Sequence, residues 1–148
     1  MEGGKELGNW PLNCSFQVLW GDIDALNHVN HTVFLKWIET ARMNYFSDCG
    51  IMELLETDQK GPILASLKID YLKPVLFPDS VNIRTTITRI GNSSFDMGYR
   101  VSSTSNGDVI VAEATVVGVM VNYQTGRPTE IPKSIRERII EIEGYSTQ

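Results

Sequence analysis

The sequence predicts an α+β fold: a curved antiparallel sheet of five strands wrapped around one long central helix, with a short C-terminal helix. One segment beginning at His31 carries apolar residues at three- and four-residue spacing, which is typical of an amphipathic helix. The other segments have strand patterns, and tight turns join most of them, so neighbouring strands should run antiparallel. A single helix with a broad apolar face is buried only if the sheet curls around it.

The first predicted strand covers residues 14–20. Residues 21–30 form a polar connector, because Asp and Asn are too frequent there for a strand to continue. Asn30 suits the N-cap of the helix and Gly50 suits its end. The apolar face of this helix contains Val33, Phe34, Trp37, Ile38, Ala41 and Tyr45.

Four further strands are predicted after the helix. Alternation of apolar and polar residues indicates one buried face in residues 63–71, 81–88 and 95–102. Residues 109–121 are nearly all apolar and predict a central strand buried on both faces. Turn sequences are Gly91-Asn92, Asn106-Gly107 and Thr125-Gly126. Pro132 suits the first position of the terminal helix.

Size and composition favour one domain spanning residues 1–148, with 42% apolar residues and a net charge of −5. The basic residues are scattered, which argues against a nucleic-acid surface. No segment approaches the roughly 20 apolar residues that cross a bilayer, and the first residues lack the apolar core of a signal peptide. We therefore expect a cytoplasmic protein that is not inserted in a membrane. Cys14 and Cys49 form no C-x-x-C motif and are expected to be free thiols.

Polar side chains concentrate in the connector before the helix: Asp22, Asp24, Asn27, His28, Asn30 and His31. A helix N-terminus offers free backbone N–H groups and the positive end of the helix dipole, which can hold a developing negative charge. A carboxylate near that terminus, with a carbonyl oxygen placed on the N–H groups, makes a hydrolytic site that needs neither a metal nor a triad. From the residues alone, Asp24 is either this carboxylate or an ordinary turn residue.

The segment from Trp20 to Arg42 resembles the opening motif of the 4-hydroxybenzoyl-CoA thioesterase family, with the sequence WGDIDALNHVNHTVFLKWIETAR. That motif is roughly D-x-D, then G-H-V-N-N, then an aromatic residue, then E-x-A-R. Residues 70–79 and 125–128 are also similar, so the resemblance spans about residues 14 to 142. It implies a hotdog fold, a homodimer or homotetramer with active sites between subunits, and no metal or organic cofactor.

The resemblance also implies a reaction and the residues that perform it. The chain would hydrolyse an acyl-CoA thioester to free acid and CoA. Asp24 matches the family's catalytic aspartate, as nucleophile or general base, and the backbone N–H of His31 matches its oxyanion donor. His28, Asn30 and Trp37 are expected to contact the substrate.

Two residues depart from the family pattern. Asn27 stands where Gly usually precedes the His, and His31 replaces the second Asn. Because the oxyanion donor is a backbone amide, the change at His31 should alter the shape of the pocket more than the mechanism. Asn27 tolerates the left-handed conformation that a Gly would adopt, so the path of the loop should survive.

Several alternatives stay open. Glu39 is the rival carboxylate, although a structural ion pair with Arg42 is the favoured interpretation. His28 and His31 have the spacing of two metal ligands but no third ligand, and His28 is also a candidate general base. Cys49 as a nucleophile and a serine triad are the other catalytic options. The alternative functions are a hydratase or dehydratase on the same fold and a non-catalytic acyl-thioester-binding module.

Overall fold

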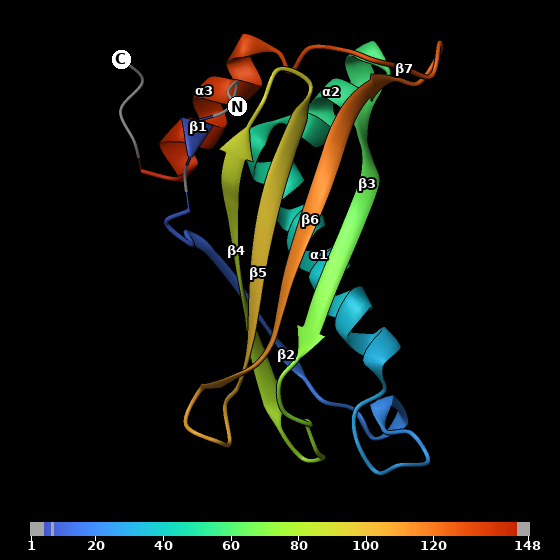
Figure 1. The fold of residues 1–148 in the computed structure, drawn as a ribbon, viewed down its shortest axis with the longest axis vertical. Coiled ribbons are helices and arrows are strands. Elements are labelled where there is room, and N and C mark those ends of the chain that lie inside the picture. The colour runs from blue at the N-terminus through green and yellow to red at the C-terminus, as the bar shows by residue number, and fades with distance from the viewer. Residues whose placement is uncertain (1–4, 7, 145–148) are drawn as a thin grey trace.

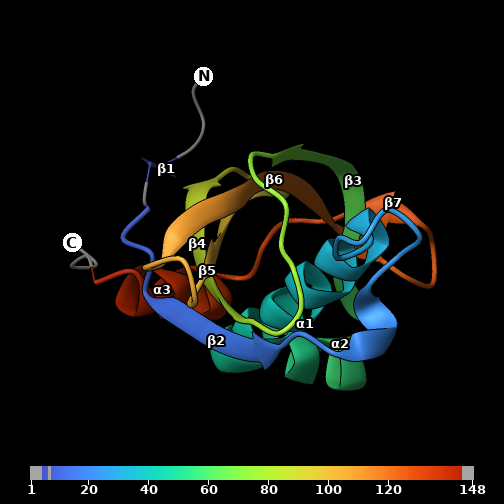
Figure 2. The same ribbon diagram turned by 90° about the horizontal axis from the view of Figure 1, so that it is seen from below.

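A computed structural model describes residues 5–6 and 8–144 (Figure 1). The strands form one sheet in the order β1-β4-β5-β6-β3, with β2 also paired to β4 and β7 to β6. Every pair of strands is antiparallel. Seen from below, the sheet curls over the long helix α1 (Figure 2). The predicted α+β architecture is therefore confirmed.

The strands are β1 (Lys5–Glu6), β2 (Leu12–Gln17), β3 (Lys60–Tyr71), β4 (Ser80–Ile90), β5 (Ser94–Ser103), β6 (Val109–Asn122) and β7 (Arg127–Pro128). The helices are α1 (His31–Cys49), α2 (Ile51–Asp58) and α3 (Lys133–Ile142), and a 3₁₀ turn, η1, covers Trp20–Asp22. The four strands predicted after the helix are all present and slightly longer than expected. The first strand ends at Gln17 rather than residue 20, because the chain turns at Leu19 into η1.

Helix α1 begins and ends where its sequence signals indicate. The side chain of Asn30 accepts a hydrogen bond from the Thr32 N–H at 2.9 Å, which makes Asn30 the N-cap. Gly50 ends the helix with a left-handed φ of 93°, a conformation that costs glycine little. The face turned to the sheet is buried: Phe34, Trp37, Ile38, Ala41, Tyr45, Phe46 and Cys49.

Several features differ from the predictions. Helix α2 was not predicted; it follows Gly50 directly, so the left-handed glycine redirects the chain and a second helical segment begins. The short strands β1 and β7 were not predicted either, so the described sheet has seven strands rather than five. Pro132 is the N-cap of α3 rather than its first residue, because its extended ψ of 148° lies outside the helical range.

Strand β6 is central, as predicted, since it pairs with both β5 and β3. The prediction that both of its faces are buried is wrong. Ala112, Ala114 and Val116 face the core, whereas Glu113 and Thr115 are exposed on the outer face. The helix α1 covers only the concave side of the curled sheet, and sequence hydrophobicity does not reveal which side that is.

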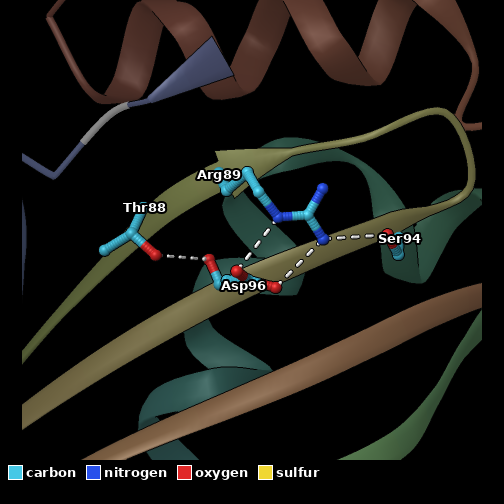
Figure 3. Close-up of polar contacts among 4 residues, drawn as sticks. All are labelled: Thr88, Arg89, Ser94 and Asp96. Atoms are coloured by element: carbon cyan, nitrogen blue, oxygen red, sulfur yellow. Dashed lines mark hydrogen bonds and ion pairs between the residues drawn. The ribbon is translucent and has the colours of Figure 1, made fainter. Parts of the chain in front are cut away.

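The β4–β5 hairpin is held by an ion pair beside its turn (Figure 3). The guanidinium of Arg89 donates from Nε to Asp96 Oδ2 at 3.0 Å and from Nη2 to Asp96 Oδ1 at 3.1 Å. The same Nη2 donates to Ser94 Oγ at 2.9 Å. Both charged side chains are only about one-third exposed. The pair fixes the register of the two strands next to the turn.

Candidate active site

The connector between β2 and α1 is folded tightly onto itself. The Asp22 carboxylate accepts from the Leu19 N–H at 2.8 Å, and the Asp22 carbonyl accepts from the Asn30 N–H at 2.8 Å. Ile23 and Val29 form an isolated antiparallel bridge. The connector is thus a closed loop that brings residues 24–28 to the start of α1. Asp22 ends the 3₁₀ turn η1 and serves this loop structurally.

Asn27 has a φ of 73°, so it adopts the left-handed conformation expected at the position where the family motif it resembles has Gly. This conformation allows the loop to reverse: the Asn27 N–H donates to the Asp24 carbonyl at 3.0 Å, and the Asp24 N–H donates to the His28 carbonyl at 2.9 Å. The departure from the family motif at Asn27 is therefore accommodated by the backbone.

Val29 joins the loop to the segment that follows β3. Its side chain is buried, and its N–H donates to the Val75 carbonyl at 2.8 Å. Because of this contact, residues 71–75 lie beside the Asp24 loop, although they are far away in the sequence. Together the two segments surround a hollow of about 360 Å³, which we call the Asp24 hollow. Its lining includes Asp24, His28, His31, Phe34, Tyr71 and Lys73.

The Asp24 side chain is half-buried, and its Oδ1 accepts from the Leu26 N–H at 2.9 Å. This bond holds one carboxylate oxygen within the loop. Hydrogen bonds between described residues leave the other oxygen, Oδ2, without a partner, so it is available to a ligand in the Asp24 hollow.

The first turn of α1 presents one backbone amide that the fold leaves unused. Asn30 accepts hydrogen bonds from two N–H groups of this turn. Its side chain accepts from Thr32, and its carbonyl accepts from Val33 at 2.9 Å. The N–H of His31 donates no hydrogen bond to any described residue. It therefore offers a donor at the positive end of the helix dipole.

Tyr71 lies at the end of β3 and was not among the predicted site residues. Its hydroxyl donates to the His31 carbonyl at 3.0 Å, and its ring lies edge-on to Phe34 at 5.2 Å between centroids. Partial burial raises the pKa of this hydroxyl above its ordinary value. By donating to the His31 carbonyl, Tyr71 helps to hold in place the residue whose backbone N–H is free. The only sequence signal was its place in the segment 70–79, which resembles the family.

The other predicted site residues lie in different environments. His28 is exposed and lines the Asp24 hollow. Asn30 caps the helix, and Trp37 is in the core, 6% exposed and stacked on Phe16 at 6.1 Å, so the fold does not bring Trp37 into the lining. Their roles in substrate binding stay predictions.

The rival carboxylate Glu39 is exposed on α1 and does not line the Asp24 hollow. The predicted ion pair between Glu39 and Arg42 is absent from the salt bridges of the described residues. Cys49 is buried, and this burial raises the pKa of its thiol to about 11, which disfavours the thiolate that a nucleophile needs. Both cysteines are free thiols, as expected.

In the part of the chain that the structure describes, no three His, Cys, Asp or Glu side chains are placed to hold a metal ion together. Likewise, none of the described helices combines the length and apolarity of a membrane span.

A model of the Thioesterase-like superfamily matches residues 18–139, a range that contains the closed loop, α1 and the whole Asp24 hollow. The chain belongs to this superfamily. Among solved structures, it is 33% identical to a thioesterase of Thermus thermophilus in complex with coenzyme A and zinc. The match covers 93% of this chain and 97% of that one, with a TM-score of 0.80.

Curated relatives are more distant. The long-chain acyl-CoA thioesterase FadM of Escherichia coli is 20% identical, with 81% of this chain and 90% of the relative covered. A 1,4-dihydroxy-2-naphthoyl-CoA hydrolase of Crocosphaera subtropica is 27% identical, with 80% and 88% covered. The expectations of a hotdog fold and of a thioester hydrolase are confirmed at the level of the superfamily. The narrower 4-hydroxybenzoyl-CoA thioesterase family stays a prediction.

Proposed function

We propose that this member of the Thioesterase-like superfamily hydrolyses an acyl-CoA thioester through Asp24 and the backbone N–H of His31. The proposal rests on one observation. Asp24, which has an available carboxylate oxygen, and His31, whose backbone N–H is the free first amide of a helix, line the same hollow. The relatives named above act on long-chain and on aromatic acyl-CoA, which supports the substrate class and leaves the acyl group open.

The mechanism follows from the two groups. The thioester carbonyl oxygen accepts from the His31 N–H, which stabilises the negative charge that develops on that oxygen. Asp24 then either attacks the carbonyl carbon, releasing CoA thiolate and leaving a mixed anhydride that water hydrolyses, or removes a proton from an attacking water. Each route yields free acid and CoA. Lys73 also lines the hollow and offers a positive charge to the anionic substrate.

Thiol release from a panel of acyl-CoAs, from short to long chains and including aromatic ones, tests the reaction. Asp24→Asn keeps an oxygen for the Leu26 N–H but removes the carboxylate, so we expect kcat to fall at least about 10²-fold. Asp22→Asn is the matched control, because that carboxylate serves the Leu19 N–H in the same loop. Equal turnover of the wild type and Asp24→Asn would contradict the role of Asp24.

Two further readouts separate the alternatives. After single-turnover hydrolysis in ¹⁸O water, label in Asp24 shows that the carboxylate attacked, because water reaches that carbon only through the anhydride. Rapid quenching, which traps the acyl group on Asp24, detects an anhydride that water opens at the acyl carbon. Label in the product acid with no trapped acyl group indicates activation of water. Tight binding of acyl-CoA by the wild type without thiol release would instead favour a non-catalytic binding module. Addition of water across an enoyl-CoA would favour a hydratase.

We also propose that the chain assembles with a second copy along β3. Among the described strands, β3 pairs only with β6, so its other edge has no strand partner. Ile63 and Leu64 on this strand are about half exposed, and Tyr71, at its end, lines the Asp24 hollow. A copy paired with this edge would bury those apolar side chains near the start of β3 and would lie beside the site at its end. Light scattering on the wild type and on Leu64→Lys tests it: the wild type should be at least a dimer, and the variant should dissociate.

A further inference from the structure

Two arginines lie directly opposite each other on the outer, convex face of the sheet. Arg84 of β4 and Arg100 of β5 are register partners, and their neighbours Ile83 and Val101 point into the core. Like charges directly opposite on adjacent strands destabilise a sheet. Arg84 makes no ion pair with a described residue. Arg84 therefore has no carboxylate partner that would reduce the repulsion between the two guanidinium groups.

Arg100 is held in one position by Trp10. Its guanidinium carbon lies 4.0 Å from the centre of the Trp10 ring, in a cation–π contact. Trp10 has a φ of 56°, an uncommon conformation for a bulky residue, and its ring lies against Gly98, where a Cβ would come within 3.0 Å of the ring. The backbone at both residues is thus adapted to keep the aromatic ring beside Arg100.

The hydrogen-bonding capacity of Arg100 is not fully used. Its Nε is buried, yet it has no hydrogen-bond partner among the described residues. Arg100 forms an ion pair with Glu113 at 3.8 Å between Nε and Oε2, which is longer than a hydrogen bond, so the hydrogen-bonding capacity of Nε stays free.

Both arginines line a hollow of about 440 Å³ on the outer face, which we call the arginine hollow. Its other polar lining residues are Asn13, Asn82, Ser102 and Asp108. The lining carries two guanidinium groups and one carboxylate, and the ion-pair partner of Arg100, Glu113, lies outside the lining, so Arg84 is the guanidinium without an ion pair among the described residues. Amide and hydroxyl groups add neutral donors between the charges.

We propose that the arginine hollow binds a small phosphate-bearing anion. Guanidinium groups bind phosphate oxygens through paired, charge-assisted hydrogen bonds, and an anion between Arg84 and Arg100 offsets their repulsion. The phosphate is either free or part of a nucleotide. The arginine hollow is lined mainly from β4 and β5, whereas the Asp24 hollow is lined by the connector, the start of α1, the end of β3 and the segment after it. The two hollows share no lining residue, so the arginine hollow is separate from the proposed hydrolytic site and does not depend on it.

Isothermal titration with inorganic pyrophosphate at low ionic strength tests the proposal on the full-length chain. The wild type should bind, and Arg84→Gln should bind at least roughly tenfold more weakly, because a charge-assisted hydrogen bond is lost. Arg84 is exposed, so this variant should fold normally. Arg127→Gln removes an equally exposed arginine outside the arginine hollow and should bind as the wild type does.

The same titration with adenosine bisphosphate identifies the source of the phosphate. Tighter binding than pyrophosphate, again weakened in Arg84→Gln, indicates a nucleotide; equal binding indicates free phosphate. Three results would overturn the proposal: no binding of either anion by the wild type, equal affinity in Arg84→Gln, or an equal loss in Arg127→Gln. A lower assembly mass of Arg84→Gln would also overturn it, since the arginines would then face another copy of the chain.

Discussion

The hydroxyl of Tyr45 donates a 2.7 Å hydrogen bond to the carboxylate of Glu143, and both side chains are almost completely buried. Glu143 also accepts from the Thr86 hydroxyl at 2.7 Å, the Ile87 N–H at 2.8 Å and the Asn9 N–H at 3.0 Å. Burial and the adjacent negative charge raise the pKa of Tyr45 well above its ordinary value. Four donors thus stabilise one buried carboxylate where α1, β4 and the end of α3 meet.

This carboxylate closes a gap in the edge of the sheet. Strand β4 pairs with β2 through Thr85 and with β1 from Arg89, which leaves Thr86, Ile87 and Thr88 between the two partners. The Ile87 N–H, which lacks a strand partner at this edge, bonds to Glu143 instead. A buried backbone donor is thereby satisfied by a side chain.

We expect Tyr45→Phe to lower the free energy of unfolding by about 2 kcal/mol, because it removes a hydrogen bond to a buried charge. Urea unfolding of the wild type and the variant measures the change. Tyr123→Phe is the control: its hydroxyl bonds to the Pro62 carbonyl, but the side chain is about half exposed, so water can replace the bond. A loss no larger than in Tyr123→Phe would show that the buried bond contributes little.

We expect Asp79→Asn to destabilise the fold at neutral pH but not in acid. Burial raises the pKa of Asp79, but hydrogen bonds from the Ser103 hydroxyl and the N–H groups of Ser105 and Ser80 outweigh it, and the net shift is downward. A lowered folded pKa gives stability that is present above the unfolded pKa and is lost as pH falls through the folded value.

The measurement is the difference in unfolding free energy between the wild type and Asp79→Asn as a function of pH. It should be constant near neutral pH and shrink below about pH 4, the ordinary range of an aspartate. Asp108→Asn is a control on an exposed aspartate. A difference that stays constant down to acid pH would mean that ionisation of Asp79 does not contribute.

We expect Asn30→Ala to cost about 1 kcal/mol of stability, the usual effect of losing an N-cap. The variant frees the Thr32 N–H next to the His31 amide, so kcat on the best acyl-CoA should fall as well. Asn30→Asp retains an oxygen for the Thr32 N–H and should restore most of the stability. Full activity in Asn30→Ala would argue that the geometry of the first turn does not matter for turnover.

Gly118→Ala should destabilise the core. A Cβ at this position would lie 2.4 Å from the ring of Phe95, which is buried and cannot move freely. Overpacking of this kind costs about 1–3 kcal/mol. Gly21→Ala, where a Cβ meets nothing within 4 Å, is the control, and a smaller side chain in Phe95→Leu should rescue Gly118→Ala.

Local patterns account for the elements that the sequence predicted well. The cap at Asn30, the left-handed Gly50 and the alternating strands each depend on a few adjacent residues, and all are present. Burial of β6 was predicted less well, because its exposed face is set by where α1 lies. The same limit explains the missed α2, whose eight residues follow a glycine that also fits a helix end.

The candidate site shows the same division. Asp24 and His31 were predicted from one continuous motif, and the fold places both on one hollow. Tyr71 and Val75 come from a segment about 40 residues later, and only pairing of β3 with β6 and the Val29–Val75 bond bring them there. No spacing rule in the sequence connects them with Asp24. Trp37 was predicted to contact the substrate, but its ring packs in the core.

The pairing of β3 has a consequence for the order in which the chain acquires its structure. Among the described strands, β3 has one partner, β6, and Tyr71 is opposite Ala112. During synthesis, the loop with Asp24 and the helix with His31 emerge first, but Tyr71 has no neighbouring strand until residue 112 has left the ribosome. Contacts of such long sequence separation form slowly. The side of the Asp24 hollow that Tyr71 lines is therefore completed late, after Asp24 and His31 have already been synthesised.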